Sequence, residues 1–130
     1  MEGLIFDTTF LIDFQRERKR GRAGAHAFLE QNRACLAYLP MVAYGEFAEG
    51  FSSLSDRRFL SVVGAFELCP VTTKVAEVYS RICFDLRAKG GLIGNNDLWI
   101  AATAVEINLP LVTRNLDHFS RVDGLALKAY

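Results

Sequence analysis

Short apolar segments alternate with longer amphipathic stretches along this chain. Five of the apolar segments have the length and composition of strands: residues 3–6, 35–39, 66–69, 111–113 and, more weakly, 125–129. They are largely apolar instead of alternating between apolar and polar positions, which is typical of strands that are covered on both faces.

The stretches between these segments predict six helices. They span residues 8–18, 25–32, 41–51, about 57–63, 73–89 and 97–107. The last three helices would be capped by Ser55-Asp56, by Thr72 and by Asn95-Asn96, and Pro40 suits the start of the third. Apolar residues surround the helix at 97–107 almost completely, so we expect it to be buried. Strands that alternate with helices indicate a parallel sheet with helices on both faces.

The composition is that of one domain with a sizeable core, because the chain has 130 residues and 51% of them are hydrophobic. No apolar run approaches the roughly 18 residues that span a bilayer. No basic segment precedes an apolar one at the N-terminus, so a signal peptide is not expected. Cys35, Cys69 and Cys83 lack metal-ligand spacing, and their odd count indicates reduced thiols in a cytoplasmic protein.

Four acidic residues stand where a predicted strand ends or a predicted helix begins: Asp7, Glu46, Asp97 and Asp117. The carboxyl ends of parallel strands meet at one edge of a sheet, so these side chains would lie close together. Two carboxylates about 4 Å apart repel each other by about 4 kcal/mol at an effective dielectric near 20. A divalent cation makes such a cluster tolerable, and ligands that are all oxygen suit Mg²⁺ or Mn²⁺. The pattern therefore predicts a metal-dependent phosphodiesterase.

Each of these acids also has a structural interpretation when taken alone. Asp7 and Asp97 would cap helices, Asp117 would form a turn, and Glu46 would be an exposed helical residue. Their joint placement in apolar surroundings favours a cluster, since a buried carboxylate is costly unless it is paired or binds a metal. The hydroxyl of Thr113 and the amide of Asn115 would hold a carboxylate or a metal-bound water. Turn chemistry explains Asn115 nearly as well.

The net charge is zero, but outside the four clustered acids the chain has 15 basic and 11 acidic residues, an excess of four positive charges. The candidates to contact RNA phosphates are Arg18, Lys19, Arg20 and Arg22 in one basic run, and Arg114. A solvated helix end explains the basic run at least as well, because cations favour that end of a helix.

Four segments carry a family resemblance: IFDTTFLID at 5–13, YGEFAEG at 44–50, IGNNDLWIAATA at 93–104, and LPLVTRN at 109–115 followed by Phe119. In these segments the chain resembles the PIN-domain ribonucleases, and more closely the VapC-type toxins of bacterial toxin–antitoxin pairs. The segments follow the family's order over nearly the whole chain, and the third and fourth together are specific.

This resemblance implies a single PIN domain over residues 1–130. The fold would be a three-layer α/β/α fold whose five-stranded parallel sheet has the order 3-2-1-4-5. The activity would be Mg²⁺- or Mn²⁺-dependent endoribonuclease cleavage of RNA in the cytoplasm. The partners would be a cognate antitoxin protein and a second copy of the chain in a homodimer, without a membrane.

The resemblance also implies which residues form the site. Asp7, Glu46 and Asp97 match the family's acidic positions as catalytic and metal-binding residues. Asp7 and Asp97 would anchor one cation, and Glu46 would help to hold it or orient the attacking water. Relatives carry the fourth acid where this chain has His118 or Asn115. Asp117 lies between these positions and is taken as the fourth residue, assisting the same cation or a weaker second one.

Two other functions compete with this interpretation. A PIN fold with a degraded site would bind RNA or protein without cleavage, as the non-acidic His118 and Asn115 suggest. A phosphatase or phospho-acceptor domain would use Asp7 at the end of the first strand. This chain has Thr9 where a second acid would be expected for that chemistry, and no lysine in residues 109–119.

Overall fold

A computed structural model describes residues 2–17 and 24–130 of the chain. Its five strands are β1 (Gly3–Phe6), β2 (Leu36–Pro40), β3 (Glu67–Cys69), β4 (Leu111–Val112) and β5 (Leu127–Lys128). They form one sheet in the order β3-β2-β1-β4-β5, and every pair of neighbours is parallel. The expected all-parallel sheet and its strand order are therefore confirmed.

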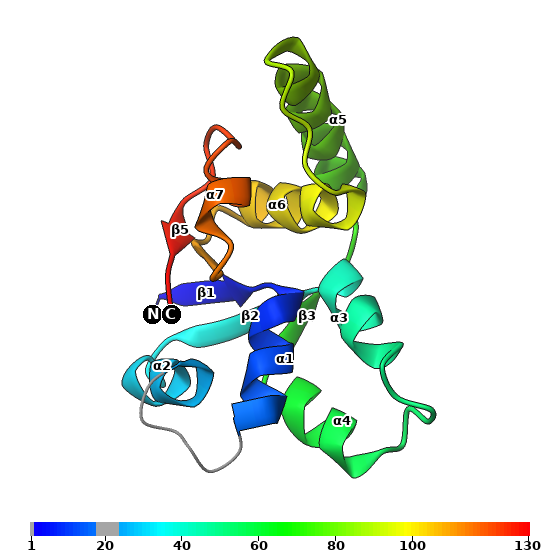
Figure 1. Ribbon diagram of the computed structural model, residues 1–130, viewed down its shortest axis with the longest axis vertical. Helices are drawn as coiled ribbons and strands as arrows, with labels where there is room; N and C mark the ends of the chain where they lie inside the picture. The colour runs from blue at the N-terminus through cyan, green and yellow to red at the C-terminus, as the bar shows by residue number, and fades with distance from the viewer. Residues whose placement is uncertain (1, 18–23) are drawn as a thin grey trace.

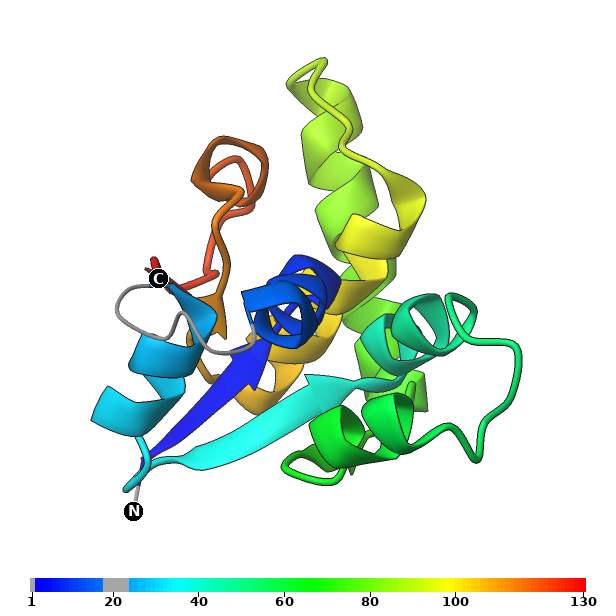
Figure 2. The same ribbon diagram turned by 60° about the horizontal axis from the view of Figure 1, so that its bottom comes forward.

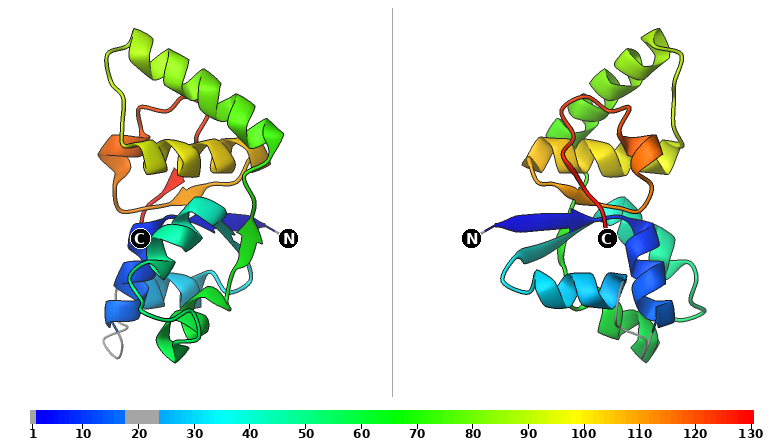
Figure 3. Two further views of the ribbon diagram at one scale, coloured as in Figure 1. Left: turned by 90° about the vertical axis from the view of Figure 1, so that its right-hand side faces the viewer. Right: turned by 60° about the vertical axis from the view of Figure 1, so that its left-hand side comes forward.

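The helices cover both faces of this sheet. They are α1 (Thr8–Glu17), α2 (Ala25–Gln31), α3 (Met41–Ala48), α4 (Arg57–Val63), α5 (Thr73–Ala88), α6 (Asn95–Ile107) and α7 (Leu116–Phe119). Figure 1 shows the central sheet with the longer α5 and α6 beyond one face. Figure 3 shows α1, α2 and α4 beyond the other face, so the three expected layers are present.

The strands β1 and β4 are wholly apolar because both of their faces are buried. Leu4 and Phe6 pack in one cluster with Phe10 and Phe28, which belong to α1 and α2. Ile5, which points the other way, belongs to a second and larger cluster that includes residues of α6. Alternate residues of β1 thus enter different cores, which explains the absence of a polar position in this strand.

The sequence placed the boundaries of the six predicted helices within one or two residues, apart from the end of the third. The third helix ends at Ala48 and not at Phe51, because the backbone N–H groups of Gly50 and Phe51 turn back to Phe47 and Ala48. The sixth helix begins at Asn95, with Gly94 as its N-cap residue and no side-chain cap. The short α7 was not predicted, since four residues are too few to show helical periodicity.

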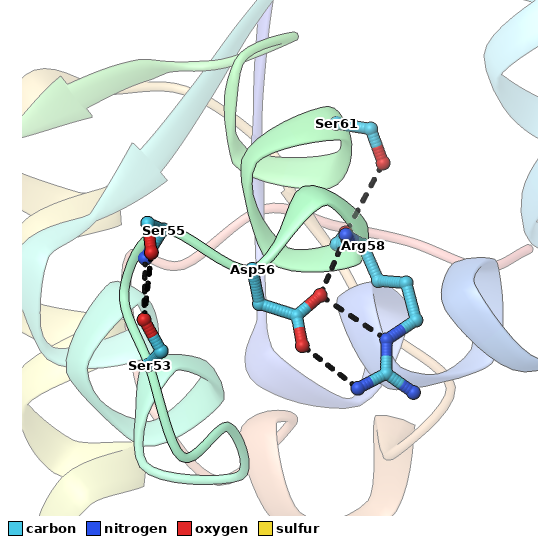
Figure 4. A network of polar contacts seen from close by, with 5 residues as sticks. All are labelled: Ser53, Ser55, Asp56, Arg58 and Ser61. Atoms are coloured by element: carbon cyan, nitrogen blue, oxygen red, sulfur yellow. Dashed lines mark hydrogen bonds and ion pairs between the residues drawn. The ribbon is translucent and has the colours of Figure 1, made fainter.

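Capping residues fix the starts of α4 and α5 as the sequence predicted. The Asp56 carboxylate accepts a hydrogen bond from the backbone N–H of Arg58 at 2.8 Å, and the Arg58 guanidinium binds the same carboxylate (Figure 4). These bonds hold the pKa of Asp56 at about 2. Thr72 accepts a hydrogen bond from Val75 at the start of α5.

A carboxylate from α1 caps α2. The two oxygens of Glu17 accept hydrogen bonds from the backbone N–H groups of Ala25 and His26, at 2.8 and 2.9 Å. Gly24 makes this approach feasible, because its φ of 93° suits glycine and an added Cβ would lie 2.1 Å from a Glu17 oxygen. Glu17 therefore fixes the position of α2 relative to α1.

Cys69 and Cys83 are buried, Cys35 is partly buried, and all three are free thiols. Within residues 2–17 and 24–130, no helix has the length and apolar character needed to cross a bilayer.

Candidate active site

Asp7 lies where β1 ends and α1 begins, and only 3% of it is exposed. One of its carboxylate oxygens accepts a hydrogen bond from the backbone N–H of Phe10 at 3.0 Å, so Asp7 also caps α1. The other oxygen accepts a hydrogen bond from the Thr113 hydroxyl at 2.6 Å. Thr113 directly follows β4, the neighbour of β1, so the parallel pairing of these strands brings the two residues together.

The surroundings of Asp7 disfavour its ionised form. The pKa of Asp7 is raised from 3.8 to about 6. Burial is the largest cause, and the negative charges of Asp97 and Asp13 also contribute to the rise. The hydrogen bonds from Thr113 and Phe10 act in the opposite direction. A carboxylate of this kind gains stability from a nearby cation.

Glu46 connects three helices at the same edge of the sheet. It lies in α3, and its carboxylate accepts hydrogen bonds from the Thr8 hydroxyl of α1 and from the Asn96 side-chain amide of α6, the latter at 2.8 Å. Sequence reasoning missed both donors, although each directly follows or precedes a candidate acid. Asn96 therefore holds Glu46 and does not cap its own helix.

Asp97 lies in the first turn of α6, with a side chain that is 32% exposed. Burial raises its pKa, the hydrogen bond from His118 opposes this effect, and the charge of Glu46 adds to it. Asp97 in turn raises the pKa of Asp7. The charge of Glu46 thus acts on Asp97, and the charge of Asp97 acts on Asp7, as expected for a cluster of carboxylates at the sheet edge.

The structure brings His118 to this cluster at the uncertain fourth position. The Nδ1 atom of His118 lies 3.4 Å from an Asp97 oxygen and 3.0 Å from the Asn115 amide nitrogen. The side chain of Asp117 is exposed, and among the described residues no hydrogen bond or ion pair joins it to the other three acids. Asp117 as a metal ligand stays a prediction.

The donor set fits a hard divalent cation in its chemistry. Asp7, Glu46 and Asp97 offer only oxygen ligands, and the raised pKa values of Asp7 and Asp97, caused first by burial, indicate that positive charge would be favourable there. In the part of the chain that the structure describes, no three His, Cys, Asp or Glu side chains already form a closed metal-binding group. A cation would therefore draw these carboxylates closer together.

The predicted RNA contacts divide into two groups. Arg18, Lys19, Arg20 and Arg22 lie outside the described residues. Arg114 follows Thr113, and its guanidinium lies 3.3 Å from the Asp13 carboxylate and 5.3 Å from the centre of the Tyr130 ring. Asp13 also accepts a hydrogen bond from the Tyr130 hydroxyl at 2.6 Å. Arg114 is thus held beside the acidic site.

Comparison with known proteins agrees with this arrangement. Residues 4–125 match the family described as the PIN domain. The chain belongs to the PIN-domain family. Within it, the chain is 30% identical to ribonuclease VapC1 of Methanocaldococcus jannaschii over 98% of this chain and 86% of that protein. The expected membership in the VapC-type group of PIN-domain proteins is therefore confirmed.

Solved structures support the same PIN fold. VapBC2 of Rickettsia felis, crystallised with a DNA fragment from its promoter, has a chain that matches with a TM-score of 0.84 at 24% identity, over 98% of both chains. A chain of the DNA-bound VapBC of Salmonella typhimurium matches with a TM-score of 0.80 at 25% identity, over 99% of this chain and 98% of its own. The three-layer PIN fold therefore accounts for nearly the whole chain.

Proposed function

We propose that this chain, as one PIN domain, is a metal-dependent endoribonuclease and the toxin of a type II toxin–antitoxin pair. The observation that carries the proposal is the buried carboxylate of Asp7, whose pKa is raised beside Asp97 at the edge of a parallel sheet. Support for RNA as the substrate comes from the relatives, which are named ribonucleases and match nearly the full chain.

The cation in this proposal is Mg²⁺ or Mn²⁺. When bound, it would activate a water molecule for attack and neutralise charge on the scissile phosphate. Asp7 and Asp97 would hold it, and Glu46 would assist or orient the water. Thr113 keeps the Asp7 carboxylate in place by its hydrogen bond of 2.6 Å.

The residues around Glu46 determine where its carboxylate can point. Both of its oxygens accept a hydrogen bond, one from Thr8 and one from Asn96, so its side chain has a fixed direction. With a proton on Nδ1, His118 would donate to Asp97; in the other tautomer, Nδ1 would accept a hydrogen bond from the Asn115 amide. These side chains orient the carboxylates without being ligands themselves.

The proposed partners are a cognate antitoxin and a second copy of the chain. A cleft of about 250 Å³ lies between α1, α3 and the start of α4, and Ile12, Glu46 and Phe51 are among its lining residues. Phe10 and Phe47 of these helices are buried in the core, so they offer little apolar surface to a partner. An antitoxin segment in the cleft would nevertheless reach Glu46 of the acidic site.

A cleavage assay on total cellular RNA tests the proposal. Purified protein free of antitoxin would be incubated with Mg²⁺, Mn²⁺ or EDTA, beside Asp97→Asn. Asp85→Asn is the matched control, because Asp85 is a half-exposed acid on α5 that pairs with Lys89. We expect discrete fragments with metal, produced equally by Asp85→Asn and lost with EDTA and with Asp97→Asn. Cleavage that persists in EDTA or in Asp97→Asn would contradict the proposal.

One observation favours a second function, in which the domain binds RNA or protein without cleaving it. His118, and not an acid, contacts Asp97 at the position of the fourth carboxylate. This alternative predicts that folded, metal-saturated protein binds RNA but leaves it intact. Growth arrest on expression, relieved by a small co-expressed partner, would favour the toxin.

A further inference from the structure

Arg114 is held beside the acidic site by two residues from distant parts of the chain. Its guanidinium lies 3.3 Å from one carboxylate oxygen of Asp13, which belongs to α1. The same oxygen accepts a hydrogen bond from the Tyr130 hydroxyl at 2.6 Å. The guanidinium also lies over the Tyr130 ring, 5.3 Å from its centre. Asp13 and Tyr130 therefore fix the direction of Arg114 from two sides.

Contacts at the edge of the sheet connect Arg114 to Asp7. Arg114 directly follows Thr113, whose hydroxyl donates to the Asp7 carboxylate at 2.6 Å. Asp13 lies in α1, the helix that Asp7 caps. Burial is the largest cause of the raised pKa values of Asp7 and Tyr130, and Asp13 contributes to both. Asp13, Tyr130 and Arg114 therefore lie within electrostatic reach of the buried Asp7 carboxylate.

Much of the Arg114 side chain is open to solvent. Its Nη2 atom faces Asp13, but the side chain is 56% exposed, while that of Asp13 is only 18% exposed. A guanidinium has five N–H donors in a planar fork that matches the oxygens of a phosphate. An ion pair that is open to solvent contributes little stability, so its main consequence here is to orient the arginine. The remaining donors of Arg114 are therefore available to an anion at the acidic site.

Tyr130 is itself fixed by the aromatic core. Its ring packs edge to face on Phe10 of α1 and Phe28 of α2, with ring centres 4.8 and 6.5 Å apart. Figure 2 shows the end of the chain, in red, lying beside α2. Burial and the hydrogen bond to Asp13 raise the pKa of Tyr130, so its hydroxyl stays protonated and keeps donating to Asp13. The Asp13 carboxylate therefore has a rigid support.

We propose that Asp13 and Tyr130 are positioning residues that hold Arg114 against the scissile phosphate of the RNA. The proposal rests on the ribonuclease function above and gives Arg114 a role in the chemical step. Arg114 would donate to the phosphate oxygens, whose charge it stabilises in the transition state because its donors are already in place. Without Asp13 the arginine keeps its charge but loses its fixed direction. The loss should therefore lower kcat and leave KM nearly unchanged.

A double-mutant cycle of Asp13→Asn and Arg114→Met tests this proposal. The assay measures kcat and KM at saturating Mn²⁺ on a short RNA around a mapped cleavage point. We expect Arg114→Met to lower kcat about a hundredfold. Asp13→Asn alone should lower kcat about tenfold with KM within about twofold. In the Arg114→Met background, Asp13→Asn should change kcat by less than about twofold, because its effect is exerted through the arginine.

Two controls separate orientation of Arg114 from other effects. Asp13→Asn also removes a negative charge near Asp7, so calorimetry should show weaker Mn²⁺ binding by the same factor with and without Arg114. The matched pair is Glu30→Gln with Arg33→Met, which removes an exposed ion pair of 2.9 Å at the end of α2. We expect these two variants to keep the natural kcat. Circular dichroism and thermal unfolding would establish that all variants fold alike.

Nuclear magnetic resonance decides the proposal without any cleavage. In the inactive Asp97→Asn background, adding the short RNA should shift the Nε–Hε resonance of Arg114, and Asp13→Asn should reduce this shift. If the natural protein cleaves no RNA, the ribonuclease function fails, while this measurement still shows whether Asp13 orients Arg114 toward a phosphate.

Two results would overturn the proposal. One is that Asp13→Asn lowers kcat by the same factor with and without Arg114, in which case Asp13 acts on the metal site directly. The other is that Arg114→Met raises KM but keeps kcat within about twofold, in which case Arg114 only helps to bind RNA away from the scissile phosphate.

Discussion

Replacing Asp7 by asparagine should make the metal-free protein more stable at neutral pH while abolishing RNA cleavage. The pKa of Asp7 rises from 3.8 to about 6 in the folded state. One pKa unit corresponds to about 1.4 kcal/mol. At a pH where Asp7 is ionised in both the folded and the unfolded protein, this shift therefore lowers the free energy of unfolding by about 3 kcal/mol. Because Asp7 is only 3% exposed, solvent screening reduces this value little.

The sign of the pH dependence follows from the raised pKa. Well below pH 3.8 the carboxyl group is protonated in the folded and unfolded states, and the penalty is absent. It grows as the pH rises through about 6, so the natural protein loses stability relative to Asp7→Asn over this range. Asparagine keeps the bond from Phe10 with its oxygen and can donate to the Thr113 hydroxyl.

Urea unfolding in EDTA at pH 4.5 and pH 8 would measure the difference. We expect Asp7→Asn to exceed the natural protein by about 1–3 kcal/mol at pH 8 and by less at pH 4.5. Adding Mn²⁺ should stabilise the natural protein and leave the variant nearly unchanged, because a ligand stabilises only the state that binds it. A variant that is less stable at pH 8, or a difference independent of pH, would refute the reasoning.

Three further substitutions test separate contacts. Thr113→Val should lower the free energy of unfolding at pH 8 by about 1.5–3 kcal/mol and raise the pKa of Asp7, because the hydrogen bond from the Thr113 hydroxyl stabilises the ionised carboxylate. Urea unfolding as a function of pH would measure both effects. Asn96→Ala should weaken metal activation of cleavage at least about tenfold, as measured by Mn²⁺ titration, with unchanged thermal unfolding. Gly24→Ala should cost about 2 kcal/mol in urea unfolding, because it strains a φ of 93° and displaces Glu17; an equal stability would show that the cap is dispensable.

The sequence predicted the sheet well because burial on two faces leaves a plain signal. Residues 3–6 are all apolar, and the structure buries all four of them. The acids at strand ends were predictable for a related reason, since an Asp directly after such a run must lie at the sheet edge. For Asp7 this argument led to a residue that the structure couples electrostatically to Asp97, in the first turn of α6.

The side chains that orient these acids could not be predicted from local pattern. Asn96 looked like a helix cap, but its amide binds Glu46, which is 50 positions away in the sequence. His118 contacts Asp97 across 21 positions, and the short helix that carries it has too few residues for a periodic signal. Such contacts depend on how helices pack, and a single sequence does not encode packing distances in any local motif.

The hydrogen bond between Thr113 and Asp7 joins residues separated by 106 positions. Non-local pairs of this kind form late, because a long stretch of chain must be ordered before they are reached. A polypeptide truncated before Leu111 should therefore show no metal binding at Asp7 by calorimetry, although β1, β2 and α1 are all present. During synthesis β4 can pair with β1 only after Val112 has been made, which is more than four fifths of the way through the 130 residues. The acidic site would therefore form as one of the last events of folding.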